Sequence, residues 1–206
     1  MRRTKEDAAK TRQSVIDAAL RLFGQRGYSG TTLRLIAAEA GCSRGPIYWH
    51  FANKEELFEA ILAYSQLPLE NLIKEYQDSH EQDDPDAVAA DFARRWLRLL
   101  LEDAYFRDSF EIFLNKTEFT EEVSKTLQRE RALTASLIAT FSGLVERSRV
   151  LRDIHPAQPA QTVAFAMYSY LMGVTQSWFL YPELANLENS LEYFVSDFLR
   201  LLRAGE

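Results

Sequence analysis

The chain has 206 residues, 47% hydrophobic and 26% charged, which excludes a disordered or fibrous protein and leaves enough apolar surface for a core. One cysteine, Cys42, excludes an intramolecular disulfide framework, and with only three histidines it excludes a Cys/His zinc cage, so a reducing cytoplasm is expected. The net charge of −6 is unevenly divided, because residues 1–54 hold 10 Lys and Arg against 4 Asp and Glu, and residues 55–206 hold 14 against 26. A basic start on an acidic body indicates that the first segment meets an anion.

Apolar residues recur every three or four positions almost throughout, and no strand-like alternation is present, so the expected fold class is all-α. The first helix is expected to stop near residues 24–27. The Thr31–Thr32 pair offers an N-cap for a short helix over 33–40. Ser43 is placed to cap a third helix that runs to about His50.

Asn53 is placed to cap the next helix, which has two acidic residues in its first turn, where the helix dipole favours them. That helix could reach Gln77, but Pro68 is expected to kink or break it. After an acidic loop over 78–85, the spacing predicts five more helices. The first of these helices begins at Asp86, the second contains Phe106 to Leu114, and the third runs from a Thr120 cap to Leu144. The last two cover about 160–180 and 187–203.

The stretch over 154–182 contains no Asp, Glu, Lys or Arg and approaches the length of a membrane-spanning helix. Its middle is interrupted by polar side chains, including Thr175 and Gln176, and its basic flanks are weak. A helix of this kind is more typical of one buried on both sides in protein, so no membrane partner is expected.

Residues 32–51 carry the pattern of two short helices joined by a three-residue turn, which is a helix-turn-helix. Ala37 is small where the helices cross, Gly41 can adopt the positive φ that the turn needs, and Ile47 fills the core between the helices. The second helix presents polar and aromatic groups, as a helix in the DNA major groove does. A helical hairpin without a DNA role remains the alternative.

Several segments resemble the N-terminal domain of TetR-family transcriptional repressors: Thr31–Thr32, IAAEAG (36–41), SRGPIYWHF (43–51) and NKEEL (53–57). RGPIYWHF and EIFLNKTEF (111–119) further resemble the acriflavine-resistance type of multidrug efflux pump repressors. The resemblance implies an all-α homodimer in the cytoplasm. Its helix-turn-helix DNA-binding domain would cover residues 1–52, and its ligand-binding and dimerisation domain residues 53–206, a boundary at which charge and helix length also change.

The same resemblance implies contacts with double-stranded DNA. Thr31 or Thr32 would bind a phosphate, Arg44 would reach base edges, and Lys54 would bind a second phosphate. The other expected contacts lie in the second helix of the motif and just before it: Ser43, Gly45, Pro46, Tyr48, Trp49 and His50. Pro46 stands where the family often has a small residue.

For the body, the resemblance implies a pocket for a small hydrophobic effector, lined by Gln66, Trp96, Phe110, Phe113, Leu114, Tyr168, Leu171, Met172, Thr175 and Gln176. This set contains aromatic, aliphatic and neutral polar groups without a charge, which favours bulky apolar ligands. Dimerisation through the last two helices is also implied. Apolar residues at spacings of three and four support it: Leu187, Leu191, Phe194, Val195, Phe198 and Leu202. A two-fold dimer predicts a pseudo-palindromic operator.

The expected mechanism is release from DNA, because the effector binds a conformation in which the fourth helix has shifted. No nucleophile–base set, paired carboxylates or glycine-rich phosphate loop is found, so neither an enzyme nor a cofactor is expected, and no metal. The alternatives left open are a TetR-like regulator of a metabolic or lipid pathway, an activator, and a helical protein-interaction module without DNA binding. A redox role for Cys42 in the turn is also left open.

Overall fold

The computed structural model describes residues 5–79, 83–118, 123–152 and 158–203. Every regular element in these ranges is a helix, which confirms the all-α fold class. The chain divides into two compact units, one made of residues 1–66 with 105–129 and the other of residues 67–104 with 130–206. Each unit therefore contains segments from distant parts of the sequence.

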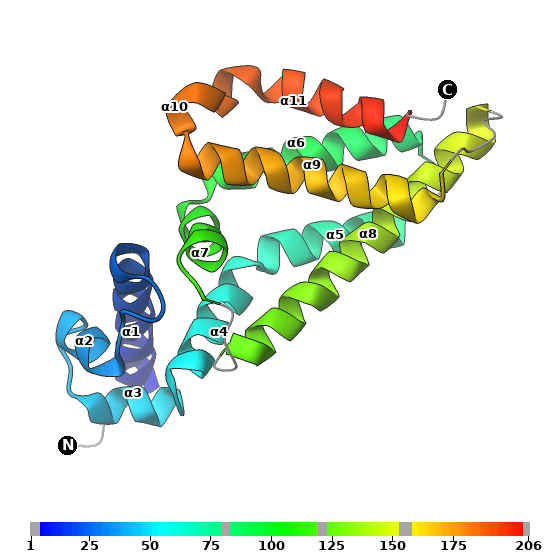
Figure 1. The fold of residues 1–206 in the computed structure, drawn as a ribbon. Helices are drawn as coiled ribbons and strands as arrows, with labels where there is room; N and C mark the ends of the chain where they lie inside the picture. Colours follow the sequence, from blue (N-terminus) through cyan, green and yellow to red (C-terminus); the bar gives the residue numbers. More distant parts are fainter. Residues whose placement is uncertain (1–4, 80–82, 119–122, 153–157, 204–206) are drawn as a thin grey trace. The chain divides into compact units, whose positions relative to one another are not determined.

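The first unit contains the N-terminal helices, α7 and the start of α8. Its helices are α1 (Lys5–Arg26), α2 (Leu33–Glu39), α3 (Arg44–His50), α4 (Lys54–Ser65) and nearly all of α7 (Ala104–Asn115) (Figure 1). The second unit holds α5 (Leu67–Ser79), α6 (Pro85–Glu102), most of α8 (Ser124–Arg152), α9 (Ala160–Leu180), α10 (Pro182–Ala185) and α11 (Leu187–Leu202).

In the first unit, α1 packs against α2, α3 and α4. The core is aromatic, because the rings of Phe23, Tyr28 and Phe58 are buried against one another with centroids 5.0–5.6 Å apart. Two predicted caps are confirmed. The hydroxyl of Thr32 accepts a hydrogen bond from the Leu35 amide at 3.3 Å, and the side-chain oxygen of Asn53 accepts one from the Glu56 amide at 2.8 Å.

Ser43 occupies the N-cap position of α3 as predicted, but its side chain makes no capping hydrogen bond. The expected cap of the long helix, Thr120, lies outside the described residues.

The predicted break near Pro68 is confirmed, because α4 ends at Ser65 and α5 begins at Leu67, with Gln66 between them. Pro68 carries no amide hydrogen to bond the carbonyl of Tyr64, and its ring would clash with that carbonyl in a continuous helix. The single helix that the apolar spacing allowed is thus two helices.

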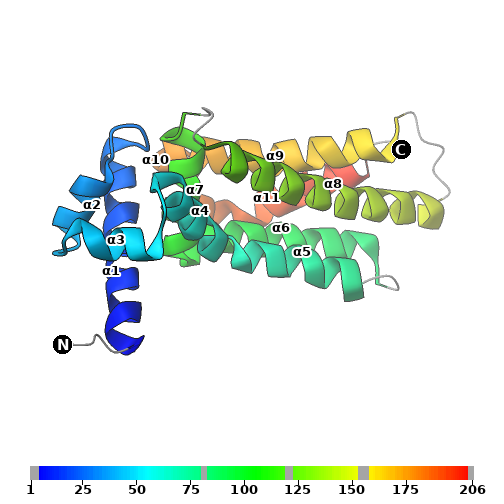
Figure 2. The same cartoon turned by 90° about the horizontal axis from the view of Figure 1, so that it is seen from below.

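In the second unit, α6, α9 and α11 lie side by side, and α5 packs on α6 (Figure 2). The rings of Phe92, Phe141 and Phe198 form a continuous core, with the Phe141 centroid 5.0 Å from that of Phe92 and 5.6 Å from that of Phe198. At one end of this unit the carboxylate of Asp86 forms ion pairs with Arg152 and Arg203, both at 2.6 Å. These ion pairs connect α6, the end of α8 and the residue after α11.

The short helix α10 was not expected. Proline opens it, where a missing amide hydrogen costs no hydrogen bond, and Asn186 ends it with φ 37° in the left-handed region that Asn tolerates better than most residues. Within the described ranges, no helix combines the length and hydropathy that crossing a membrane requires.

Candidate functional site

The predicted helix-turn-helix forms from α2, the connection over residues 40–43 and α3, so the connection is one residue longer than the three-residue turn predicted. The Gly41 amide donates to the carbonyl oxygen of Ala38 at 3.2 Å, and the Cys42 amide donates to that of Ala37 at 3.0 Å. Gly41 has φ 64°, the left-handed conformation expected of it. Ala37 and Ile47 are both buried, which confirms them as the packing residues of the motif.

Helix α3 presents most of the predicted DNA-contacting residues to solvent. Tyr48 is 55% exposed and Trp49 is 74% exposed, an unusual degree for rings of this size on a folded chain. Arg44 is also exposed. Of the other predicted DNA-contacting residues in this segment, Ser43 and Gly45 are exposed and Pro46 and His50 are half-buried. The helix therefore offers a polar and aromatic face that fits a DNA groove.

A hollow of about 610 Å³ opens beside α3. Three cationic side chains line it, those of Arg34, Arg44 and Lys54, against one carboxylate, that of Glu55, so we call it the cationic hollow. Its other lining residues include Thr32, Asn53 and Tyr48. Neither Arg34 nor Asn53 was among the predicted DNA contacts. The place of Arg34 in the basic first segment was a signal for a residue near the hollow. Asn53 was predicted only as a helix cap, and it caps α4 while also lining the hollow.

The two threonines before α2 are placed differently. Thr32 is exposed, whereas Thr31 is fully buried and its hydroxyl lies 2.8 Å from the carbonyl oxygen of Gly27 and 3.2 Å from that of Leu22. The hydroxyl of Thr31 therefore stabilises the chain between α1 and α2 and is not at the surface. Of the two threonines, only Thr32 is exposed, so only its side chain is accessible for the predicted phosphate contact.

Lys54 is half-buried at the start of α4. Its ammonium donates a hydrogen bond to the carbonyl oxygen of Tyr28 at 3.1 Å and lies 4.0 Å from the centroid of the Tyr28 ring. The charge is therefore held in one place at the edge of the hollow, as a fixed phosphate-binding group would be.

Four of the predicted effector-binding residues belong to the first unit. Gln66, Phe110 and Phe113 are buried, and Leu114 is half-buried. Phe110 packs against Phe106 with ring centroids 5.4 Å apart. Helix α7 thus carries an apolar, aromatic face.

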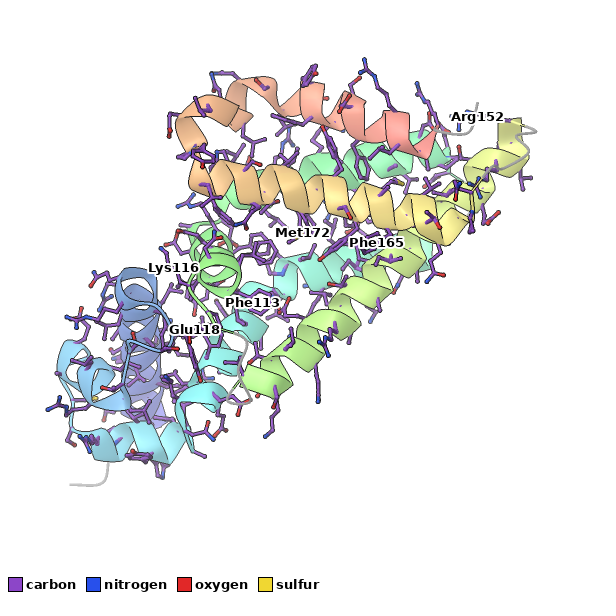
Figure 3. All side chains as sticks on the ribbon, in the orientation of Figure 1. Phe113, Lys116, Glu118, Arg152, Phe165 and Met172 are labelled. Atoms are coloured by element: carbon purple, nitrogen blue, oxygen red, sulfur yellow. The ribbon has the colours of Figure 1, made fainter. Side chains whose placement is uncertain are left out.

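The other six lie on α6 and α9 in the second unit. Trp96, Leu171 and Thr175 are buried, and the indole nitrogen of Trp96 donates to the Thr175 hydroxyl at 3.0 Å. Tyr168, Met172 and Gln176 are half-buried on α9, where Met172 is labelled in Figure 3. The hydroxyl of Tyr168 lies 3.4 Å from that of Thr134. Since their spacings are three and four, the five α9 residues share one side of the helix.

The residues predicted for the dimer interface are mostly inside the second unit. Leu187, Val195, Phe198 and Leu202 are buried within one chain, where α11 packs against α6 and α9. Leu191 and Phe194 are half-buried, and the backbone carbonyl of Phe194 accepts a hydrogen bond from Tyr170. On α9 and α11 the aromatic rings that are exposed are not in the predicted set. They are Phe165 on α9, labelled in Figure 3, and Tyr193 on α11.

Together, the motif, its exposed α3 side chains and the cationic hollow define a helix-turn-helix DNA-binding protein. The chain belongs to the TetR family: the family model "Bacterial regulatory proteins, tetR family" matches residues 15–61. The model "MAATS-type transcriptional repressor, C-terminal region" matches residues 93–204. The family expected from the residues of the motif is therefore confirmed, and the family consists of transcriptional regulators.

Relatives match nearly the whole length. The HTH-type transcriptional regulator TtgR of Pseudomonas putida is 32% identical over 98% of this chain and 96% of its own. The solved structure of NalD, the secondary repressor of the MexAB-OprM multidrug efflux pump in Pseudomonas aeruginosa, is 30% identical, with a TM-score of 0.83 over 95% of this chain and 97% of its own. A complex of SmeT with triclosan has a TM-score of 0.74 at 25% identity, over 92% of this chain and 90% of its own, and SmeT represses a Stenotrophomonas maltophilia multidrug efflux pump.

Proposed function

We propose that this protein is a ligand-responsive repressor that binds a pseudo-palindromic operator as a homodimer, controls a multidrug efflux operon, and leaves its operator when a bulky hydrophobic effector binds. The observation that carries the proposal is the exposed face of α3 beside the cationic hollow, on a chain whose second half matches a repressor family. Similarity to NalD and SmeT supports efflux as the regulated process.

The DNA contacts divide by chemistry. Arg44 has the length and the paired donors to read a guanine edge in the major groove. Tyr48 and Trp49 would contact thymine methyl groups or the backbone, as would His50. Thr32, Arg34 and Lys54 surround the hollow and would bind phosphate oxygens, which position the helix without reading bases.

The residues proposed for effector binding form two separate sets, one on the aromatic side of α7 in the first unit and one on the Tyr168–Gln176 side of α9 in the second unit. Both sets are apolar with a few neutral polar groups, which suits a ligand of the triclosan kind, the molecule found in the SmeT complex. We retain a shift of α4 as the route to release. A nearly complete switch requires that the effector favour the released conformation about 10⁴-fold, which is about 5.5 kcal/mol.

The homodimer would form on the exposed sides of α9 and α11, since their opposite sides fill the core of one chain. Phe165 on α9 and Tyr193 on α11 are 55% and 65% exposed. On α9, Ala166, Ser169 and Gly173 are exposed at spacings of three and four. Such small residues allow a partner helix to approach closely.

The test is to select bound duplexes from a random DNA pool with the purified full chain and to sequence them. A pseudo-palindrome is expected, with half-sites about one helical turn apart, and triclosan should lower the affinity for it. Recovery of no preferred sequence would contradict the proposal. We further infer that the protein acts by binding alone, without turnover of substrate, at DNA in the bacterial cytoplasm, so the effector should be recovered unchanged.

A further inference from the structure

Tyr28 lies at a junction within the first unit, just after α1. Its ring is 1% exposed and packs against Phe23 and Phe58, with centroids 5.6 Å and 5.0 Å away. It also lines the cationic hollow. A buried ring held from two sides has little freedom, so groups attached to Tyr28 are held in place with it.

One such group is the ammonium of Lys54. It donates to the backbone carbonyl of Tyr28 at 3.1 Å and lies 4.0 Å over the Tyr28 ring. A lysine side chain has four rotatable bonds, and free in water its charge would occupy many positions. An ammonium has three donors, so the hydrogen bond to Tyr28 does not by itself use up the capacity of Lys54 to bind a phosphate. The Tyr28 contacts therefore decide where the Lys54 charge is offered to DNA.

Tyr28 is in turn attached to the segment that follows α7, where Figure 3 labels Lys116 and Glu118. The Tyr28 amide donates to the carbonyl oxygen of Lys116 at 2.8 Å. On one side, a Cβ added to Gly27 would lie 3.2 Å from the same oxygen. On the other, the Ser29 hydroxyl donates to Glu118 at 3.3 Å. Tyr28 and Ser29 thus hydrogen-bond to this segment, and Gly27 leaves little room beside it for a side chain.

The carbonyl of Lys116 is fixed to the last turn of α7. The Lys116 amide donates to the carbonyl oxygen of Ile112 at 3.0 Å, and the hydroxyl of Thr117 donates to the same oxygen at 2.9 Å. The Lys116 ammonium pairs with Glu111 at 2.8 Å. Since Phe113 lies in the same turns, a displacement of that part of α7 would carry the Lys116 carbonyl with it.

We propose that Tyr28 is a positioning residue for DNA binding, which places the Lys54 ammonium against a phosphate and is itself placed by the Lys116 carbonyl at the end of α7. The inference rests on the proposed function, because it assumes that Lys54 contacts operator DNA. It adds a connection from α7 to the DNA-contacting surface that runs through a backbone hydrogen bond, separate from any shift of α4.

The test is a double-mutant cycle read by fluorescence anisotropy of operator DNA at several salt concentrations. Lys54→Met should lower the slope of log affinity against log salt by about 1, the loss of one phosphate contact. Tyr28→Leu removes the ring but keeps the carbonyl, so it should lower the slope by part of that amount in the native background and have no further effect on it when Lys54 is Met. Tyr28→Phe keeps the ring and should keep the slope. Equal slope changes from Tyr28→Leu in both backgrounds would overturn the proposal, because a merely structural effect does not depend on Lys54.

The proposed connection from the end of α7 to Tyr28 is tested by alanine substitution at two glycines that have similar backbone conformations. Gly27 and Gly41 have φ 73° and 64°, so alanine strains both, but a Cβ meets the Lys116 carbonyl at Gly27 and nothing within 4 Å at Gly41. Gly27→Ala should lower the salt slope by about 1 in the native background and leave it unchanged when Lys54 is Met. Gly41→Ala should leave the salt slope at its native value whichever residue stands at 54.

If Gly27→Ala leaves the salt slope at its native value, the connection to α7 is contradicted. Failure of the proposed function is distinguishable from this, because then the native chain itself would show no preferred duplex and no steep salt dependence. Thermal unfolding of each variant, measured without DNA, separates loss of the fold from loss of the phosphate contact.

Discussion

The indole nitrogen of Trp96 donates a hydrogen bond to the hydroxyl of Thr175 at 3.0 Å, and that hydroxyl donates onward to the carbonyl oxygen of Leu171 at 2.8 Å. Both side chains are buried, Trp96 at 2% and Thr175 at 0% exposure. The chain of two bonds joins α6 to α9 within the second unit. Two residues proposed for effector binding therefore also satisfy each other's polar groups within the second unit.

Thr175→Val tests this bond, because valine keeps the shape and removes the hydroxyl. Taking the acceptor from a buried indole N–H is expected to lower the free energy of unfolding by about 1–3 kcal/mol. Urea unfolding followed by fluorescence measures the change. Ser177→Ala, at an exposed position on the same helix, should change stability by less than about 0.5 kcal/mol. A valine variant as stable as the native chain would contradict the role of the bond.

Arg44→Ala should reduce sequence discrimination more than it reduces non-specific affinity, because Arg44 is proposed to read a base edge. The expected loss is about 1–3 kcal/mol of preference at one base pair in each half-site. Competition between the operator and single-base variants measures it. Arg131→Ala, at an exposed position on α8, is the matched control and should leave discrimination intact. An equal loss of affinity for all sequences would instead assign Arg44 to a phosphate.

Phe165→Lys combined with Tyr193→Lys should dissociate the proposed homodimer, because two ammonium groups would be buried without partners in an apolar interface. Sedimentation velocity should show the chain shifting to the mass of a monomer. Trp49→Lys exchanges an even more exposed ring on α3 and should leave the dimer intact. If the double variant sediments as the native chain does, the interface lies elsewhere.

The Asp86 ion pairs predict a pH dependence of stability. Burial raises the pKa of Asp86, but hydrogen bonds and charge from Arg152 and Arg203 lower that pKa by more, so it lies below its ordinary value. The ion pairs therefore stabilise the fold fully above about pH 4, the ordinary range of Asp, and this contribution is lost as the pH falls through the lower pKa of the folded state.

Asp86→Asn should accordingly cost about 1–2 kcal/mol at pH 7, a modest figure because Arg203 is half-exposed and its share is screened by solvent. The difference from the native chain should narrow below about pH 4. Urea unfolding at both pH values measures it. Asp108→Asn, which breaks a more exposed ion pair with Arg107, serves as the control and should change little. A cost that is independent of pH would contradict the assignment.

The local structure of the DNA-binding motif was predictable because each signal acts within a few residues. Gly41, Thr32 and Asn53 take the roles expected of them, since a positive φ or a cap depends on neighbouring backbone groups. The differences from the prediction were of the same local kind. Ser43 stands at a cap position without bonding, and the Thr31 hydroxyl turned inward because carbonyl oxygens of α1 and Gly27 were within reach.

What covers an apolar face was not predictable, because helical spacing identifies the face and not its partner. The Leu187, Val195 and Phe198 side of α11 reads equally as a dimer interface or as core, and in one chain it packs against α6 and α9. Long-range hydrogen bonds between backbone groups were also not predictable, because every residue type except proline carries the same backbone donor and acceptor. The hydrogen bond from the Tyr28 amide to Lys116 joins residues whose side chains do not specify it.

The first unit is assembled from two stretches of chain, residues 1–66 and 105–129. A fragment ending after α4 would therefore lack Lys116 and Ile112, which cover Tyr28 and the region of Gly24 in the whole protein. Its last helix would be 12 residues long, too short to persist in water on its own hydrogen bonds. The helix-turn-helix segment is thus not expected to fold independently of the rest of the first unit. A chimaera that joins it to another ligand-binding domain would have to include α7.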